Sequence, residues 1–288
     1  MKTSSLSSNT EIPQVLADLH CHSLRSDGQL SPADLVDRAA EMGVGMLALT
    51  DHDTLSGLQE AKLQAQQHDI EIINGIEFSC VYNGMGIHVV GLGFDETHPG
   101  MLAAVALQEQ RRQERAVTIA ERLEKKGAHG VMEEAQRVAN GAQLGRPHFA
   151  QALINMGKVN NMAQAFKKYL GAGKPGDVKA LWPDITEVVS WIVEAGGVAV
   201  LAHPDSYKLT RTKLKLLLTA FTAAGGRAVE VVTSTMESSF TSRMSEMCEE
   251  FNLLASQGSD FHGPKPWTEL GRFPKMPNGL TPVWSHWQ

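Results

Sequence analysis

Two kinds of apolar pattern recur along the chain. Short apolar runs rich in Val, Ile, Leu and Ala are typical of buried strands, and longer segments with apolar residues three or four apart are typical of helices packed on a sheet. The pattern predicts strands at residues 15–20, 44–49, 70–74, 86–93, 198–202, 228–232 and 253–256. It predicts helices at 32–42, 56–68, 102–126, 131–140, 147–156, 161–170, 184–195, 210–223 and 239–250.

Strands and helices alternate in residues 15–96 and again in 184–288, which is typical of an α/β fold with a mostly parallel sheet. Residues 97–183 contain helices and no convincing strand, so we expect a small helical insertion there. Residues 1–14 are polar and Ser-rich and are expected to form a flexible tail. Seven strands suffice to close a barrel, and the C-terminal mouth of such a barrel normally carries the chemistry.

Composition favours a globular protein of the cytoplasm. The chain is 42% hydrophobic and 20% charged, without a low-complexity tract. Its three cysteines are widely spaced, so a disulfide framework is not expected. The first dozen residues lack the apolar core of a signal peptide, and no run approaches membrane-spanning length.

The charge is unevenly spread. The net charge is −6, but residues 97–183 hold 13 Lys/Arg against 7 Asp/Glu. A basic segment on an acidic body favours a polyanionic ligand held from one side. Solvated helix faces are the alternative reading of the same charges.

The ends of the predicted strands carry candidate metal ligands. Side chains alternate along a strand, so His20 and His22 point to the same side, a rigid start to a divalent-metal site, while Cys21 points away into the core. For any one such residue, a capping Asp or a hydrogen-bonded His is the alternative. The full set of candidates is His20, His22, Asp27, His52, Glu77, His88, His203, Asp260 and His262.

These nine groups exceed what one ion needs and suit two or three ions that share a bridging carboxylate, for which Glu77 is the natural choice. Three divalent ions would leave a net charge of about +3, which attracts a phosphate and stabilises its transition state. A metal-held water with a pKa lowered toward about 7 would be the nucleophile, so no protein nucleophile is predicted. Mixed imidazole and carboxylate ligation suits Mn, Zn or Fe.

The motifs DLHCHS, RSDG, TDHDT, GIEFS, IHVVG, LAHP and GSDFH resemble, in order, those of the PHP (polymerase and histidinol phosphatase) phosphoesterases. The resemblance covers most of residues 15–262. It implies a distorted seven-stranded, TIM-like β/α barrel that holds three metal ions, with Mn preferred and Zn or Fe possible. The implied ligand sets are His20, His22, Glu77 and Asp260 for one ion, Glu77, His88 and His203 for the second, and Asp27, His52 and His262 for the third.

Within the insertion, GRPHFA (145–150) and FKKYL (166–170) resemble the branch of RNase AM, a 5′-3′ exoribonuclease, and of the nucleoside 3′,5′-bisphosphate phosphatases. In that branch the insertion covers the active site and helps hold nucleotide phosphate. Arg146 and His148 are the candidates for that contact, because they lie at a predicted helix start where free N–H groups favour anions. Lys174, in a Gly-rich segment, is a further candidate, and a surface Arg with a packed His is the alternative.

Three functions follow. The first is a metal-dependent phosphoesterase that trims short 5′-phosphorylated RNA from its 5′ end, as in rRNA processing, and also hydrolyses 3′,5′-bisphosphonucleosides. Phe149, Phe166, Tyr169 and Trp182 are the aromatic residues of the insertion and form no evident stacking platform, which favours a short footprint. The second is a small-molecule phosphatase such as a histidinol-phosphate phosphatase. The third, an inactive metal-binding module, fits poorly because all nine positions are filled. RNA or a nucleotide is the expected partner, with neither a membrane nor a protein partner implied.

Overall fold

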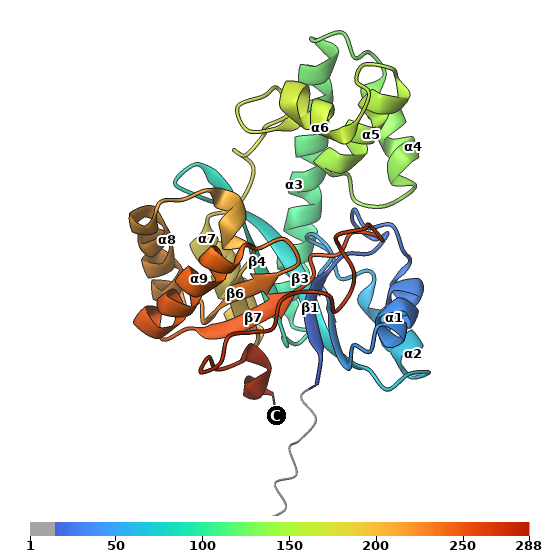
Figure 1. Cartoon of the computed structure of the whole chain (residues 1–288). Helices are drawn as coiled ribbons and strands as arrows, with labels where there is room; N and C mark the ends of the chain where they lie inside the picture. The colour runs from blue at the N-terminus through green and yellow to red at the C-terminus, as the bar shows by residue number, and fades with distance from the viewer. Residues whose placement is uncertain (1–14, 288) are drawn as a thin grey trace, which may run out of the picture.

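A computed structural model describes residues 15–287; the tail expected at 1–14 lies outside the described residues. Its strands form one seven-stranded sheet in the order of the chain (Figure 1). The strands are β1 (Ala17–Cys21), β2 (Met46–Leu49), β3 (Glu71–Tyr82), β4 (Met85–Leu92), β5 (Val198–Leu201), β6 (Ala228–Thr233) and β7 (Leu254–Gly258).

The sheet is parallel except around β4, which runs antiparallel to both β3 and β5. A two-residue turn, Asn83-Gly84, joins β3 to β4, and both residues have positive φ (48° and 74°), as a tight hairpin turn requires. β3 continues to Tyr82, well beyond the strand predicted at 70–74, so Glu77 lies inside a strand rather than after one.

The sheet closes almost completely into a barrel. The segment after β7 bonds to β1: the Asp260 N–H donates to the His20 carbonyl and the His22 N–H donates to the Phe261 carbonyl, each at 2.8 Å. The seven-stranded α/β barrel expected from the sequence is therefore confirmed. Closure brings the first and last motifs of the chain to the same edge.

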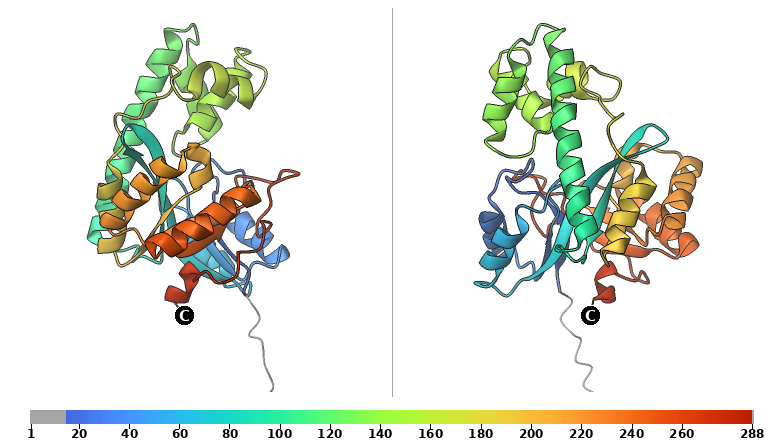
Figure 2. Two further views of the ribbon diagram at one scale, coloured as in Figure 1. Left: turned by 60° about the vertical axis from the view of Figure 1, so that its left-hand side comes forward. Right: turned by 180° about the vertical axis from the view of Figure 1, so that it is seen from behind.

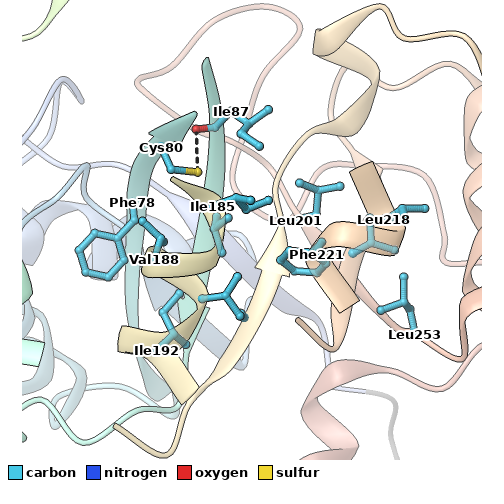
Figure 3. Close-up of a cluster of buried hydrophobic side chains, with 14 of the residues drawn as sticks. Phe78, Cys80, Ile87, Ile185, Val188, Ile192, Leu201, Leu218, Phe221 and Leu253 are labelled. Atoms are coloured by element: carbon cyan, nitrogen blue, oxygen red, sulfur yellow. Dashed lines mark hydrogen bonds between the residues drawn. The ribbon is translucent and has the colours of Figure 1, made fainter. Parts of the chain in front are cut away.

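Helices cover the outside of the barrel. Their apolar faces pack against the strands and form a hydrophobic core between helices and sheet (Figure 3). Phe78, Ile192, Leu201 and Phe221 are among the fully buried side chains between the strands and these helices. The α-helices are α1 (Pro32–Glu41), α2 (Leu58–Ala65), α3 (Pro99–Glu124), α4 (Val131–Ala139), α5 (Arg146–Asn155), α6 (Met162–Ala165), α7 (Ile185–Glu194), α8 (Arg211–Ala223) and α9 (Ser238–Phe251). Three short helices of other types are η1 (Phe166–Leu170), η2 (Pro204–Tyr207) and η3 (Val283–His286).

Between β4 and α7 the chain forms α3, α4, α5, α6 and η1, which stand over one edge of the barrel (Figures 1 and 2). α3 begins three residues before the predicted start, because the His98 side chain caps it and Pro99 occupies its first position. The other helices pack on the far half of α3 around a separate apolar cluster that includes Ile119, Phe149 and Leu153. The domain limits expected at 96/97 and 183/184 stay a prediction.

Candidate metal centre and substrate cavity

The structure brings all nine predicted ligands to one rim of the barrel, the one that faces the insertion. They come from six of the seven strands or from the loops that follow them. His20 and His22 lie at the end of β1, with Asp27 in the next loop; His52 follows β2; Glu77 and His88 lie within β3 and β4; His203 follows β5; Asp260 and His262 follow β7.

Glu77 lies at the centre of this rim. Its carboxylate oxygens lie 2.9–3.5 Å from ring nitrogens of five histidines: His20, His22, His52, His88 and His203. Neighbouring imidazoles in this ring have centroids 4.6–5.8 Å apart. Burial opposes ionisation of Glu77, but the surrounding imidazoles outweigh burial and hold its pKa well below the usual range.

Asp27, Asp260 and His262 lie outside this ring, on the side of His22. The His262 ring stacks on the His22 ring at 4.2 Å, and its Nε2 lies 3.4 Å from an Asp27 oxygen. Asp260 Oδ1 is 3.4 Å from His22 Nε2. In the described part of the chain, three overlapping sets of side chains lie close enough together to hold a metal ion each. The sets are His22, Asp27, His52 and His262; His20, His22 and Glu77; and His52, Glu77 and His88.

This donor set fits divalent cations. Burial and the neighbouring His262 imidazole lower the pKa of His22 to about 3, so its ring is neutral and offers a lone pair at neutral pH. Its buried Nδ1 has no hydrogen-bond partner among the described residues. A buried polar atom without a partner is costly, and a bound cation satisfies it. The assignment of each residue to a particular ion stays a prediction.

Glu230 holds two of the histidines around Glu77 in place and was not among the residues selected from the sequence. It is buried in β6, where one carboxylate oxygen accepts a hydrogen bond from His20 Nδ1 at 2.6 Å and the other accepts from the His203 backbone N–H. The first bond fixes the His20 ring so that Nε2 faces Glu77. A charged residue inside the apolar run Ala-Val-Glu-Val-Val was the available sequence signal.

Asp53 joins the insertion to the rim and was also missed. It is fully buried next to His52, and its carboxylate accepts hydrogen bonds from the Ser79 N–H (2.7 Å), Gln108 Nε2 (2.8 Å) and Arg112 Nε (2.6 Å). Gln108 and Arg112 are one turn apart on α3. Asp53 therefore fixes α3, and Arg112 in particular, over the metal-ligand cluster.

Three arginines of the insertion line the cavity above the cluster. The Cζ atoms of Arg112 and Arg115 lie 5.5 and 5.0 Å from the centre of the Trp182 ring, and Arg146 lies over Phe166. A cavity of about 130 Å³ extends from these arginines to Asp27 and His52. A second, of about 430 Å³, shares Arg115, Arg146 and Trp182 with it and reaches His203 and Tyr207.

The cavity is electrostatically prepared for an anion. Burial, together with the neighbouring Arg146 and Arg112 guanidiniums, lowers the pKa of Arg115 to about 9. Arg115 Nε donates to the Val178 carbonyl at 2.8 Å, and an Arg146 nitrogen donates to the Leu170 carbonyl at 3.3 Å. Asp177, in the wall of the larger cavity, attracts both guanidiniums without forming an ion pair with either. An entering phosphate could make the direct charge-assisted contacts that both arginines lack within the described chain.

Comparisons with known proteins agree with this geometry. A family model described as PHP domain matches residues 18–133. A 5′-3′ exoribonuclease of Haemophilus influenzae is 44% identical over 93% of this chain and 97% of its own length. A 3′,5′-nucleoside bisphosphate phosphatase of Chromobacterium violaceum is 39% identical over 93% of this chain and 94% of its own. The chain belongs to the PHP family.

A solved structure described as an amidohydrolase from Chromobacterium violaceum with bound sulfate superposes with a TM-score of 0.88 and 38% identity, covering 94% of this chain and 95% of its own. Membership of the PHP family identifies the protein as a hydrolase of phosphoesters. Among residues 15–287, no helix is long and apolar enough to cross a membrane.

Of the three residues predicted to contact phosphate, one lines the cavities and two do not. Arg146 lines both cavities. His148 is buried and its Nδ1 accepts a hydrogen bond from the Gly145 N–H at 3.0 Å, so it caps the start of α5 and lines neither cavity. Lys174 is exposed and also lies outside both. Arg112, Arg115 and Trp182 occupy the cavity wall instead.

Glu230 is expected to control metal affinity through His20. Glu230→Gln replaces a carboxylate acceptor with an amide and weakens the orientation of the ring, so affinity for a divalent metal should fall about 10- to 100-fold. Competition with a chromophoric chelator measures this change. Glu237→Gln, an exposed change beyond the end of the same strand, is the control, and equal affinities of the two variants would refute the role of Glu230.

Asp53 is expected to stabilise the fold through Arg112. Asp53→Asn leaves the buried guanidinium without its counter-charge and should lower the unfolding free energy by about 3–5 kcal/mol. Urea unfolding of chelator-treated protein measures the difference. Arg137→Gln removes an exposed Arg–Glu pair of the same insertion and should leave stability nearly unchanged; a similar loss in both variants would contradict the expectation.

Proposed function

We propose that this PHP protein is a metal-dependent phosphoesterase that releases nucleotides from the 5′ end of short 5′-phosphorylated RNA and also hydrolyses nucleoside 3′,5′-bisphosphates. One observation carries the proposal: the buried Arg115 and the half-buried Arg146 form no ion pair with any carboxylate that the structure describes, and both line the cavities that reach the metal-ligand cluster. The names of the two relatives support it, since both relatives align over nearly the whole chain.

The two activities are one reaction on two substrates. Both substrates contain a nucleotide with a 5′-phosphate and an ester at its 3′ oxygen. Water adds to the 3′ phosphorus, the bond from phosphorus to the 3′ oxygen breaks, and that oxygen takes a proton. The product is the same 5′-mononucleotide, and the other product is inorganic phosphate or an RNA shortened by one nucleotide that again carries a 5′-phosphate.

In this proposal the two parts of the site have separate tasks. The nine rim residues would hold three divalent ions, Mn²⁺ by preference. When bound, these ions supply a water of lowered pKa and neutralise phosphate charge. Arg115 and Arg146 bind the 5′-phosphate, Asp53 holds Arg112 beside them, and Glu230 orients His20. A role in rRNA 5′-end processing in the cytoplasm extends the proposal on family resemblance.

Turnover of competing substrates tests the function. With added Mn²⁺, the protein should release mononucleotides from a 5′-phosphorylated oligoribonucleotide and phosphate from adenosine 3′,5′-bisphosphate. Histidinol phosphate should be a poor substrate, because it lacks the second phosphate that the arginines bind. Each nucleotide substrate should inhibit hydrolysis of the other competitively. Folded, metal-loaded protein that releases no mononucleotide would exclude the exoribonuclease activity.

Arg146 is expected to recognise the 5′-phosphate. Arg146→Gln removes a charge-assisted contact worth about 1.5–3 kcal/mol, so KM for 5′-phosphorylated RNA should rise about 10- to 100-fold while KM for the 5′-hydroxyl form changes little. Steady-state kinetics on the matched pair of substrates measures the difference. Arg137→Gln removes the same charge from the exposed face of α4 and should have no such effect. Equal losses on both substrates would assign Arg146 another role.

A further inference from the structure

An aromatic side chain is exposed on the segment that follows the last metal-ligand candidate. Trp267 has 67% of its surface exposed, the largest fraction among the exposed large hydrophobic residues of residues 15–287. It lies five residues after His262, so at most about 17 Å of extended chain separates them. The segment lies along the barrel edge that faces the insertion (Figure 1).

The turn that carries Trp267 is held firmly in place. The backbones of Lys265 and Thr268 exchange two hydrogen bonds, of 3.3 and 3.2 Å, with Pro266 and Trp267 at the tip between them. At the base of the turn, a Cβ added at Gly263 would lie 2.5 Å from the Gln29 side chain, so the turn packs closely on the loop that contains Asp27. A tight turn of this kind presents the indole ring at little further entropic cost.

The other end of the turn is anchored as well. The Arg38 guanidinium makes a two-pronged ion pair with Glu269, and Leu270 is fully buried. The Trp267 ring is therefore exposed, while the backbone on both sides of it is fixed to the rest of the fold.

The chain that forms the turn starts beside the smaller cavity. The larger cavity joins Arg115 and Arg146 to His203, and the smaller one continues from the same arginines to Asp27 and His52. Next to Asp27 lies His262, 3.4 Å away, from which the chain leads directly to the turn. A strand with its 5′-phosphate at the arginines and its scissile phosphate at the metal-ligand cluster can continue past Asp27 toward His262.

We propose that Trp267 is a stacking platform for a nucleobase of the RNA on the 3′ side of the scissile phosphate. The inference rests on the proposed exoribonuclease function and adds a binding site for the part of the substrate that leaves. Every base has a π-face, so one indole ring binds any sequence. This suits an enzyme that advances along RNA one nucleotide at a time. Lys265, exposed beside Trp267, adds a positive charge near the backbone.

Substrate length separates this site from the catalytic one. In Trp267→Ala, KM for a 5′-phosphorylated octaribonucleotide should rise about 5- to 100-fold, as expected for loss of one stacked base. KM for adenosine 3′,5′-bisphosphate, which has no leaving strand, should not change. Substrates of two to eight nucleotides should show the effect appearing by about six, since stacked nucleotides rise about 3.4 Å each.

Two matched variants identify the cause. Trp267→Phe keeps an aromatic face and should retain most of the affinity for the octaribonucleotide. Leu216→Ala removes another exposed apolar side chain, 59% exposed on α8, and should behave as the unaltered protein. Fluorescence anisotropy of a labelled octaribonucleotide with chelator-treated protein measures binding without turnover and should show the same order of affinities.

The outcomes distinguish this inference from the proposed function. If the protein cleaves the octaribonucleotide and Trp267→Ala changes neither its KM nor its binding, the stacking site is refuted while the exoribonuclease stands. Equal losses on the octaribonucleotide and the bisphosphate would also refute it, because they indicate a disturbed active site. If the unaltered protein binds RNA through Trp267 without cleaving it, the exoribonuclease fails and the binding site stands.

Discussion

The structure depends on one buried charge. Glu77 is 1% exposed, and five imidazoles surround its carboxylate. A carboxylate without such partners would be far too costly to bury. The five histidines come from the end of β1, from β4 and from the segments after β2 and β5, and Asp260 and His262 join them from the segment after β7. The full set therefore requires the sheet to curve until β7 meets β1. The barrel and the charge at its rim are thus mutually dependent.

Much of this arrangement could be predicted because a barrel brings residues at the ends of successive strands together at one rim. His20, His52, His203 and Asp260 are far apart in the chain, yet each follows or ends a strand, and strand ends share one rim. The strand positions themselves were predictable from apolar runs, while their ends were less so. Asn74, Gly75 and Glu77 interrupt the apolar run after Ile73, so the pattern did not indicate that β3 continues to Tyr82.

The residues that support the rim could not be predicted, since their partners are distant in sequence. Asp53 has the appearance of a capping residue beside His52, and only the folded chain brings Arg112, 59 positions away, to its carboxylate. His148 was selected because it lies in a motif at a predicted helix start, and Lys174 because it lies in a Gly-rich segment. Neither signal specifies the direction of a side chain. His148 turns back to cap its own helix instead of entering the cavity.

The fold gives a physical explanation for the uneven distribution of charge along the chain. The barrel supplies a cluster of groups that can hold metal ions, and the insertion places Arg112, Arg115 and Arg146 around the cavity beside it, so a bound cation and the guanidiniums would face one another across the cavity. Burial, and after it the Arg146 and Arg112 guanidiniums, lower the pKa of Arg115, so the arginines already disfavour one another's charge. A ligand with two phosphates, one for each side, relieves the repulsion at both places, whereas a single phosphate relieves only part of it. Two phosphates on one nucleotide would therefore satisfy both parts of the site, which is why the proposed substrates share that feature.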